Sequence, residues 1–172
     1  ELDSFQFLLT HQQGGTPLFA GIMMEEAKAE VVKPDSVKLT ITGSSGAFFV
    51  ELNVIAVGGV TYMTNPITNQ WEVVPIEVSP LGIFDPGEGI RDIMLKIKNP
   101  MLADKGDGDE QYYLIQGTVG AETLQPILGV ITQGSDIEVN LKIEKVSRRL
   151  FEAVIKGQIT PGEQEGIIRV IE

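Results

Sequence analysis

The stretch SDIEVNLKIEKV, residues 135–146, decides the fold class of this chain. Its apolar residues Ile137, Val139, Leu141 and Ile143 alternate with polar ones. Successive side chains of a β-strand point to opposite faces, so the alternation predicts a strand with one buried face and one wet face. Strands of this kind are typical of antiparallel sheets that have one face on the core.

The same period of two recurs along most of the chain. SVKLTIT, residues 36–42, and FQFLLTH, residues 5–11, both place three apolar residues on one face. Turn signals rich in Gly, Asp and Ser separate such segments, so the chain reads as a series of antiparallel strands. We predict further strands at 47–57, 60–64, 70–74, 110–119, 149–159 and 166–171.

One segment, PLFAGIMMEEAKAEVV at residues 17–32, has the composition of a helix. As a strand, however, it would carry a nearly apolar face interrupted only by Glu25. We predict a strand. That face would consist of Phe19, Gly21, Met23, Ala27, Ala29 and Val31.

Two segments break the alternation. FDPGEGIRDIMLKIKN, residues 84–99, combines an N-cap at Asp85 with apolar residues at helical spacing. GAETLQPILGVI, residues 120–131, repeats that spacing more weakly because Pro126 interrupts it. The stripes consist of Ile90, Ile93, Met94 and Ile97 in the first helix, and of Leu124, Ile127, Leu128 and Ile131 in the second.

Together these segments predict an α+β fold, in which short helices cover one face of a large twisted antiparallel sheet. No linker or repeat divides the sequence, so we predict a single domain over residues 1–172. The helix stripes could pack on the sheet as core, or stand apart from it around an apolar ligand. Small residues on the inner faces would leave room for a ligand; they are Gly21, Ala27, Ala29, Ala153 and Gly157.

The segment TYMTNPITNQWEVVP, residues 61–75, holds the only tryptophan of the chain. Asn65 and Pro66 predict a turn between two strands. Tyr62 and Trp71 are then candidate cross-strand neighbours that fix the register of the hairpin. We favour this structural role over a recognition role for the aromatic residues.

Charge and composition exclude several functions. Acidic residues outnumber basic ones 24 to 13, and the net charge of −11 disfavours binding to nucleic acid. Cysteine is absent and His11 is the only histidine, so neither a catalytic triad nor a cysteine–histidine metal site is indicated. The acidic loop at residues 104–110 could bind calcium, but its spacing differs from that of an EF-hand. We expect no cofactor and no enzymatic activity.

Two longer runs resemble the LppX/LprA/LprF/LprG family of bacterial lipoproteins. They are SVKLTITGSSGAFFVELNVIAVGGVTYMTNPITNQWEVVP, residues 36–75, and FDPGEGIRDIMLKIKNPMLADKGDGDEQYYLIQGTVGAETLQPI, residues 84–127. The resemblance implies a half-barrel like the lipoprotein carriers LolA and LolB, with an apolar cavity between the sheet and the helices. It also implies binding and transport of acylated lipids or glycolipids in the cell envelope.

The resemblance implies a location as well. Family members are anchored outside the cytoplasmic membrane by an N-terminal lipidated cysteine that follows a signal peptide. The sequence starts at Glu1 without such a segment, so we expect the signal, the cysteine and a preceding helix to have been removed.

By the same resemblance, apolar residues of the helices and of the sheet would line the cavity. An envelope sensor or protein-interaction module on the same scaffold, with an envelope protein as partner, is the alternative; a lipid esterase is a third, against which the shortage of histidine counts. The residues expected to bind lipid are Ile90, Ile93, Met94, Ile97, Leu124, Ile127 and Leu128 on the helix side, and Val50, Leu52, Val54, Tyr113 and Ile115 on the sheet side.

Overall fold

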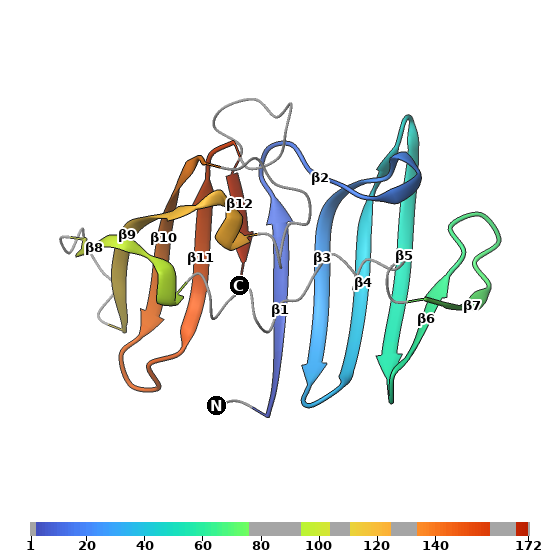
Figure 1. The fold of residues 1–172 in the computed structure, drawn as a ribbon, viewed down its shortest axis with the longest axis horizontal. Coiled ribbons are helices and arrows are strands. Elements are labelled where there is room, and N and C mark those ends of the chain that lie inside the picture. The colour runs from blue at the N-terminus through green and yellow to red at the C-terminus, as the bar shows by residue number, and fades with distance from the viewer. Residues whose placement is uncertain (1–2, 76–93, 104–110, 125–133, 159–167, 172) are drawn as a thin grey trace.

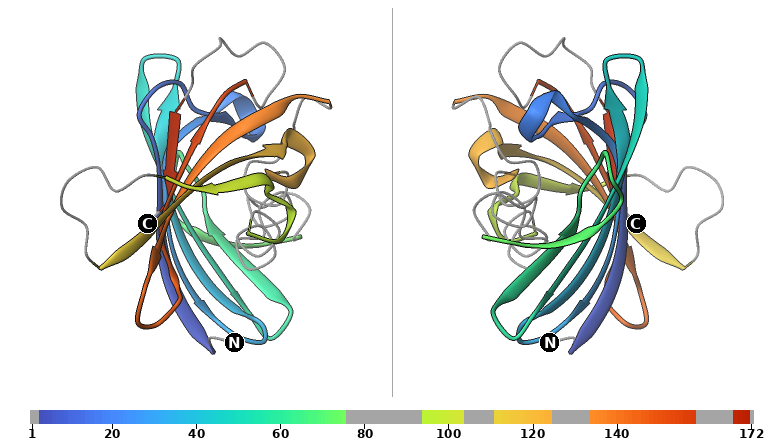
Figure 2. Two further views of the ribbon diagram at one scale, coloured as in Figure 1. Left: turned by 90° about the vertical axis from the view of Figure 1, so that its left-hand side faces the viewer. Right: turned by 90° about the vertical axis from the view of Figure 1, so that its right-hand side faces the viewer.

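The strands form one open, strongly curved antiparallel sheet (Figures 1 and 2). A computed structural model describes residues 3–75, 94–103, 111–124, 134–158 and 168–171. The strands are β1 (Ser4–His11), β2 (Thr16–Pro17), β3 (Met23–Val32), β4 (Ser36–Ser45), β5 (Phe48–Val57), β6 (Val60–Thr64), β7 (Trp71–Val74), β8 (Lys98–Leu102), β9 (Tyr112–Gly120), β10 (Asp136–Glu144), β11 (Leu150–Lys156) and β12 (Ile168–Ile171). The described residues also include two short 3₁₀ helices, η1 (Phe19–Gly21) and η4 (Ala121–Leu124).

The sheet consists of two meanders joined by the first and last strands. Its order is β7-β6-β5-β4-β3-β1-β12-β11-β10-β9-β8, with β2 paired to β3 outside this path. Neighbours within each half are mostly consecutive in the chain, as expected for short connections. β1 and β12 pair in antiparallel fashion, with Leu9 opposite Ile171. Within the described residues, no pairing joins the outer strands β7 and β8, so the sheet does not close on itself.

The core lies on the concave side of the sheet. Buried side chains alternate with exposed ones in β10, as the period of two predicts, and the same holds for β1, β3 and β4. Apolar residues from both meanders belong to a single buried cluster. The prediction of a large antiparallel sheet is therefore confirmed, and each strand predicted from residues 5–11, 36–57 and 60–74 is present. The strands predicted at 110–119, 149–159 and 166–171 are present with slightly shifted ends.

The prediction of one strand over residues 17–32 is wrong in its first half. Phe19 and Gly21 lie in η1, and the continuous strand begins only at Met23. Within β3 the pairing with β4 shifts between Met24 and Glu26, which marks a β-bulge. The bulge reverses the alternation, so Met24 is buried at 2% exposure whereas Met23 is 39% exposed. Ala27, Ala29 and Val31 face the core as predicted.

The hairpin of residues 60–74 has the predicted turn but a different register. Asn65 accepts hydrogen bonds from the backbone N–H groups of Ile67 and Thr68 through its side-chain oxygen, which fixes the turn. Tyr62 lies opposite Val73, and Trp71 lies opposite Thr64. The two aromatic residues are therefore diagonal neighbours and not a direct cross-strand pair.

The two predicted helices lie largely outside the described residues. Residues 94–96 are helical, but Ile97 follows this turn and is not part of it. Residues 98–102 form β8, an edge strand that the sequence did not predict, because Pro100 and the left-handed Asn99 interrupt any strand pattern. Of residues 120–131, Ala121–Leu124 form the 3₁₀ helix η4. In the described part of the chain, no helix has the length and apolarity needed to cross a membrane.

Candidate functional site

The concave face of the sheet carries an uninterrupted row of apolar positions. Directly opposed residues share a face of the sheet, so the row can be followed through the strand pairings from β8 to β5. It crosses nine strands and contains no charged or polar residue. Its members, in order, are Leu102, Ile115, Leu141, Ala153, Ile171, Leu9, Ala27, Ile41 and Leu52.

Small side chains lie on both sides of the central strands β1 and β12. Ala27 and Ala29 lie side by side on β3, and Ala153 lies on β11. Larger residues flank them: Ile41 is opposite Ala27, and Phe7 is opposite Ala29. A methyl group reaches less far from the sheet than a leucine or phenylalanine side chain, so the face is lower at these alanines than at Phe7 and Leu9 on the central strand β1.

The predicted sheet-side residues all belong to this concave face. Leu52 and Val54 are fully buried, and Val50 is half-buried against the same cluster. On the other meander, Ile115 is half-buried, whereas Tyr113 is 44% exposed. The structure therefore brings these residues onto one surface, closed at its centre and accessible at the Tyr113 end.

The predicted helix-side residues divide into two groups. Leu124 in η4 is fully buried, Ile97 packs against the buried cluster, and Met94 is 41% exposed. The others lie outside the described residues; they are Ile90, Ile93, Ile127 and Leu128.

Ile97 approaches the backbone of β9 at Gly117. A Cβ atom built on Gly117 would lie 2.5 Å from Cγ2 of Ile97 and 2.9 Å from the carbonyl oxygen of Lys98. Ordinary carbon–carbon contacts are about 3.5–4.0 Å, so only glycine permits this approach. Gly117 is opposite Val139, a concave-face position on β10, and Ile97 therefore covers this part of the face.

The only histidine is occupied by structural hydrogen bonds. Nδ1 of His11 lies 3.0 Å from the carbonyl oxygen of Glu25 and therefore donates to it. Nε2 lies 3.0 Å from Oγ1 of Thr16, a residue that is 1% exposed. Since Thr16 is buried, its hydroxyl is not placed to attack a substrate. The expectation that His11 is the last residue of a strand is confirmed.

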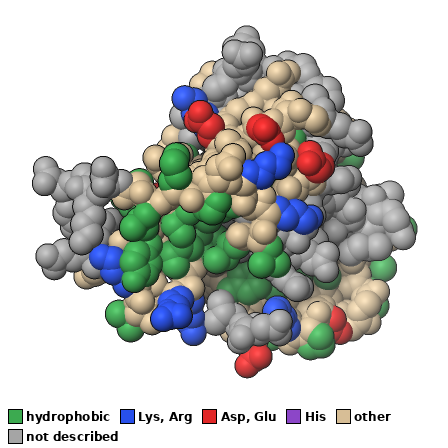
Figure 3. All heavy atoms as spheres, turned by 60° about the vertical axis from the view of Figure 1, so that its left-hand side comes forward, with side chains coloured by type: hydrophobic (Ala, Val, Ile, Leu, Met, Phe, Trp, Pro, Cys, Tyr) green, Lys and Arg blue, Asp and Glu red, His purple; other side chains and the backbone are tan. Residues whose placement is uncertain are grey.

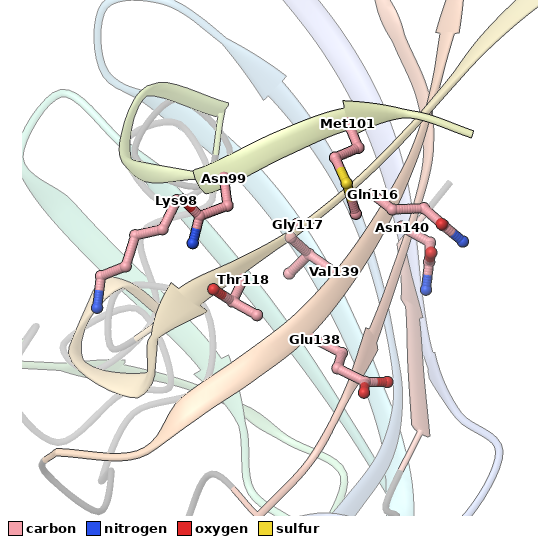
Figure 4. Close-up of a pocket in the computed structure, with 9 residues that line it drawn as sticks. All are labelled: Lys98, Asn99, Met101, Gln116, Gly117, Thr118, Glu138, Val139 and Asn140. Carbon is pink, nitrogen blue, oxygen red and sulfur yellow. The ribbon is translucent and has the colours of Figure 1, made fainter. Parts of the chain in front are cut away.

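A hollow of about 340 Å³ with a lining of both polar and apolar groups opens between β8 and its neighbours β9 and β10. The pairing of β8 with β9 shifts between Lys98 and Met101, and side chains from both strands line the hollow (Figure 4). Gln116 and Asn140 contribute polar side chains to its lining. Nearby, a hydrogen bond from Lys98 to Asp136, 2.8 Å long, raises the pKa of the lysine. None of the residues expected to bind lipid is among the described residues that line this hollow.

Nothing in the described segments indicates a metal centre. No group of three or more His, Asp or Glu side chains there is arranged to hold an ion. The acidic loop at 104–110, the candidate calcium site of the sequence, lies outside the described residues.

Several concave-face residues were not predicted as site residues. Leu102 on β8 is exposed at the end of the apolar row, and Leu9 and Leu141 are buried within it. Alternation marked Leu9 and Leu141 as inward-facing, but the sequence does not show which strands become neighbours. For Leu102 the sequence held no signal, because β8 does not alternate.

Solved structures share this fold. LprF from Mycobacterium bovis superposes with a TM-score of 0.68 at 17% identity, covering 99% of this chain and 84% of that one. LppX from Mycobacterium tuberculosis gives a TM-score of 0.58 at 16% identity, with 98% and 84% covered. Identities this low show the fold alone. No curated protein sequence matches the chain.

The family assignment rests on the sequence as well as on the fold. The family model described as LppX_LprAFG lipoprotein matches residues 2–164. That range includes β1 to β11 and thus nearly all of the apolar row. The expected family is confirmed: the chain belongs to the LppX_LprAFG lipoprotein family.

Proposed function

We propose that this protein binds acylated lipids or glycolipids on the concave face of its sheet and carries them within the cell envelope without enzymatic chemistry. The observation that supports it most is the apolar row across nine strands, from Leu102 to Leu52. Burial of each methylene group contributes about 0.8 kcal/mol, so acyl chains can be held on such a surface without a charged anchor.

The lipid first contacts the exposed part of this surface. Leu102 and Tyr113, which their strand pairings place on the concave face, are exposed, and so is Met94 in the turn before β8. Leu52, Val54 and Leu124 are fully buried, so an acyl chain reaches them only when the side chains that cover them move aside. The helix-side positions Ile90, Ile93, Ile127 and Leu128 complete the proposed lining.

Membership of a lipoprotein family supports the proposed location. We place the protein outside the cytoplasmic membrane, held there by an N-terminal lipid anchor. Protein isolated from a membrane-containing host is then expected to carry extractable lipid, and native mass spectrometry should show masses above that of the bare chain.

Uptake of a fluorescent fatty acid from solution tests the binding surface. Tyr113 on the concave face and Tyr62 on the convex face are similarly exposed, at 44% and 37%, and form a matched pair. We expect Tyr113→Ala to weaken uptake about tenfold, equivalent to about 1.4 kcal/mol of lost apolar contact. Tyr62→Ala should leave uptake unchanged. Absence of uptake by the unaltered protein, or an equal loss in both variants, contradicts the proposal.

A protein-interaction module is the second candidate, because the convex face also exposes apolar residues. Ile55, Tyr62 and Val73 are directly opposed across β5, β6 and β7, and all three are exposed. Capture of one envelope protein that persists when fatty acid occupies the concave face, and that Tyr62→Ala abolishes, favours this role. A lipid esterase finds less support, because Nδ1 of the only histidine faces the Glu25 carbonyl and not a carboxylate.

A further inference from the structure

The turn between β10 and β11 concentrates positive charge in an acidic protein. Its sequence KVSRR, residues 145–149, contains three basic residues and no acidic one, whereas the whole chain has a net charge of −11. Arg148 and Arg149 are exposed. Among the residues that the structure describes, neither arginine forms an ion pair with a carboxylate. The two carboxylates that flank the turn have other partners: that of Glu144 accepts a hydrogen bond from Ser147, and that of Glu152 pairs with Lys142 at 3.0 Å.

The turn also presents an apolar tip. Val146 is 94% exposed, the largest value among the large hydrophobic residues that the structure describes. A valine at such a position gains nothing from the folded core. Only burial in another apolar phase would lower its free energy.

Hydrogen bonds hold the turn in one shape. The backbone N–H of Arg148 donates to the carbonyl oxygen of Glu144 at 2.8 Å, and that of Glu144 donates to Arg149 at 2.9 Å. The N–H of Lys145 donates to the carbonyl oxygen of Gln111 at 2.9 Å, which ties the turn to the start of β9. Little conformational entropy is therefore lost when the turn contacts a surface.

Aromatic residues lie directly behind the basic turn. The rings of Tyr112 and Phe151 are 4.8 Å apart, and Phe151 is 50% exposed. Nζ of Lys145 lies 5.6 Å from the centre of the Tyr113 ring. Figure 3 shows hydrophobic side chains gathered on the side of the molecule that includes β8 and β9, with Lys and Arg side chains along their lower border.

We infer that this surface, formed by Lys145, Val146, Arg148, Arg149 and Phe151, docks the protein on an anionic lipid bilayer. Basic residues attract anionic headgroups, and aromatic residues favour the boundary between headgroups and acyl chains. The apolar tip distinguishes a bilayer from a free phosphate or a polyanion, which offer no apolar phase. Because the remainder of the protein is acidic and repelled by such a bilayer, the turn also sets the orientation.

The surface lies where a lipid could pass between the bilayer and the concave face. Tyr113 follows Tyr112 on β9 and belongs to the concave face, opposite Ile143. Figure 1 shows the β10–β11 turn at the same end of the molecule as the start of β1. Docking itself does not depend on lipid binding by the concave face; only this transfer step rests on the proposed function.

Vesicle flotation tests the inference with the chain as it exists. Vesicles of phosphatidylcholine with about one third phosphatidylglycerol are compared with vesicles of phosphatidylcholine alone. The double variant Arg148→Gln with Arg149→Gln removes two charges at the turn, and Gln fits the left-handed backbone of Arg148 no worse than Arg. The control, Lys28→Gln with Lys38→Gln, removes two exposed charges from β3 and β4 and gives the same net charge.

We expect binding to the anionic vesicles only. Each arginine contributes about fivefold, equivalent to about 1 kcal/mol, so the turn variant should bind about 25-fold more weakly. The control should change binding less than twofold, and Val146→Ser should weaken it several-fold. All variants should unfold at the wild-type urea concentration and take up fatty acid from solution normally, which separates docking from the proposed function.

Three results would overturn the inference. The first is no preference for anionic vesicles over neutral ones, or no binding to either. The second is an equal loss of binding to anionic vesicles in the turn variant and the control, which would show that binding depends on net charge alone. The third is binding to heparin as strong as binding to the anionic vesicles, together with unchanged vesicle binding by Val146→Ser. These two results would show that the turn binds a soluble polyanion.

Discussion

Replacing Gly117 by alanine tests whether Ile97 is fixed against the concave face. A Cβ atom at this position would lie 2.5 Å from Cγ2 of Ile97, about 1 Å closer than an ordinary carbon–carbon contact. Either Ile97 moves away from β9, or β9 shifts in the sheet. In both cases the contact between the segment before β8 and the sheet is lost or strained.

The expected cost follows from the size of this overlap. Adding a methyl group to a packed region costs about 1–3 kcal/mol, and alanine recovers about 0.4–1 kcal/mol because it restricts the unfolded chain. We therefore expect Gly117→Ala to lower the free energy of unfolding by about 1–2 kcal/mol. For a domain of this size, that corresponds to a decrease in Tm of about 2–8 °C.

A double-mutant cycle isolates the contact. Ile97→Ala removes the side-chain atom that a Cβ of Gly117 would strike, so the cost of Gly117→Ala should fall by about 0.5–1 kcal/mol when it is combined with Ile97→Ala. The remaining cost comes from the Lys98 carbonyl oxygen, which would lie 2.9 Å from the new atom. Urea unfolding followed by circular dichroism gives the four free energies.

Two outcomes refute this reasoning. One is a Gly117→Ala variant as stable as the unaltered protein. The other is a cost that is the same with and without the Ile97→Ala substitution, because the strain then lies in the backbone of β9 and not in the contact with Ile97.

Three further predictions concern the sheet. Gly43→Ala should cost more than about 3 kcal/mol or prevent folding, since its Cβ would lie 2.0 Å from the Met23 carbonyl oxygen; a urea midpoint near that of the unaltered protein argues against the bulge geometry. Trp71→Ala should lower Tm by about 2–8 °C and leave fatty-acid uptake unchanged; the reverse pattern assigns Trp71 to the binding surface. Leu52→Ala, at a fully buried position, should cost about 2–5 kcal/mol in urea unfolding, whereas Val57→Ala at an exposed position of the same strand should cost less than about 0.5 kcal/mol; similar values contradict the assignment of faces.

Most strands could be predicted because alternation is a local property. In residues 135–146 each inward residue is two positions from the next, and that spacing alone identifies the buried face. The same reasoning failed at β3, where one extra residue between Met24 and Glu26 reverses the alternation. It also missed β8, since Pro100 at the edge of the sheet removes the pattern.

The candidate site could be predicted only in part. Val50, Leu52 and Val54 were identified as inward-facing, and the structure places all three with Ile115 in or against one buried cluster. The sequence did not show that Leu52 and Val54 are closed off while Tyr113 is exposed. Accessibility depends on which segments pack above each position, and this is not encoded in the spacing of neighbours.

The basic turn also has one property that the sequence shows and another that only the folded structure shows. Its charges are visible in the sequence KVSRR, residues 145–149, but so are many other surface charges. Only the folded chain shows that Arg148 and Arg149 lie free of the described carboxylates while Val146 projects beside them.

The sequence alone determined the class of this protein: an antiparallel sheet with an apolar face, in a family recognised along the length of the chain. Periodicity and composition are local or additive, so they can be read residue by residue. The tertiary structure determined the properties that depend on contacts between residues far apart in the sequence. It paired Leu9 with Ile171 so that two meanders became one sheet, and it aligned nine strands into a single apolar row. Register and burial arise from contacts between segments far apart in the chain, and neither exists before those segments pack.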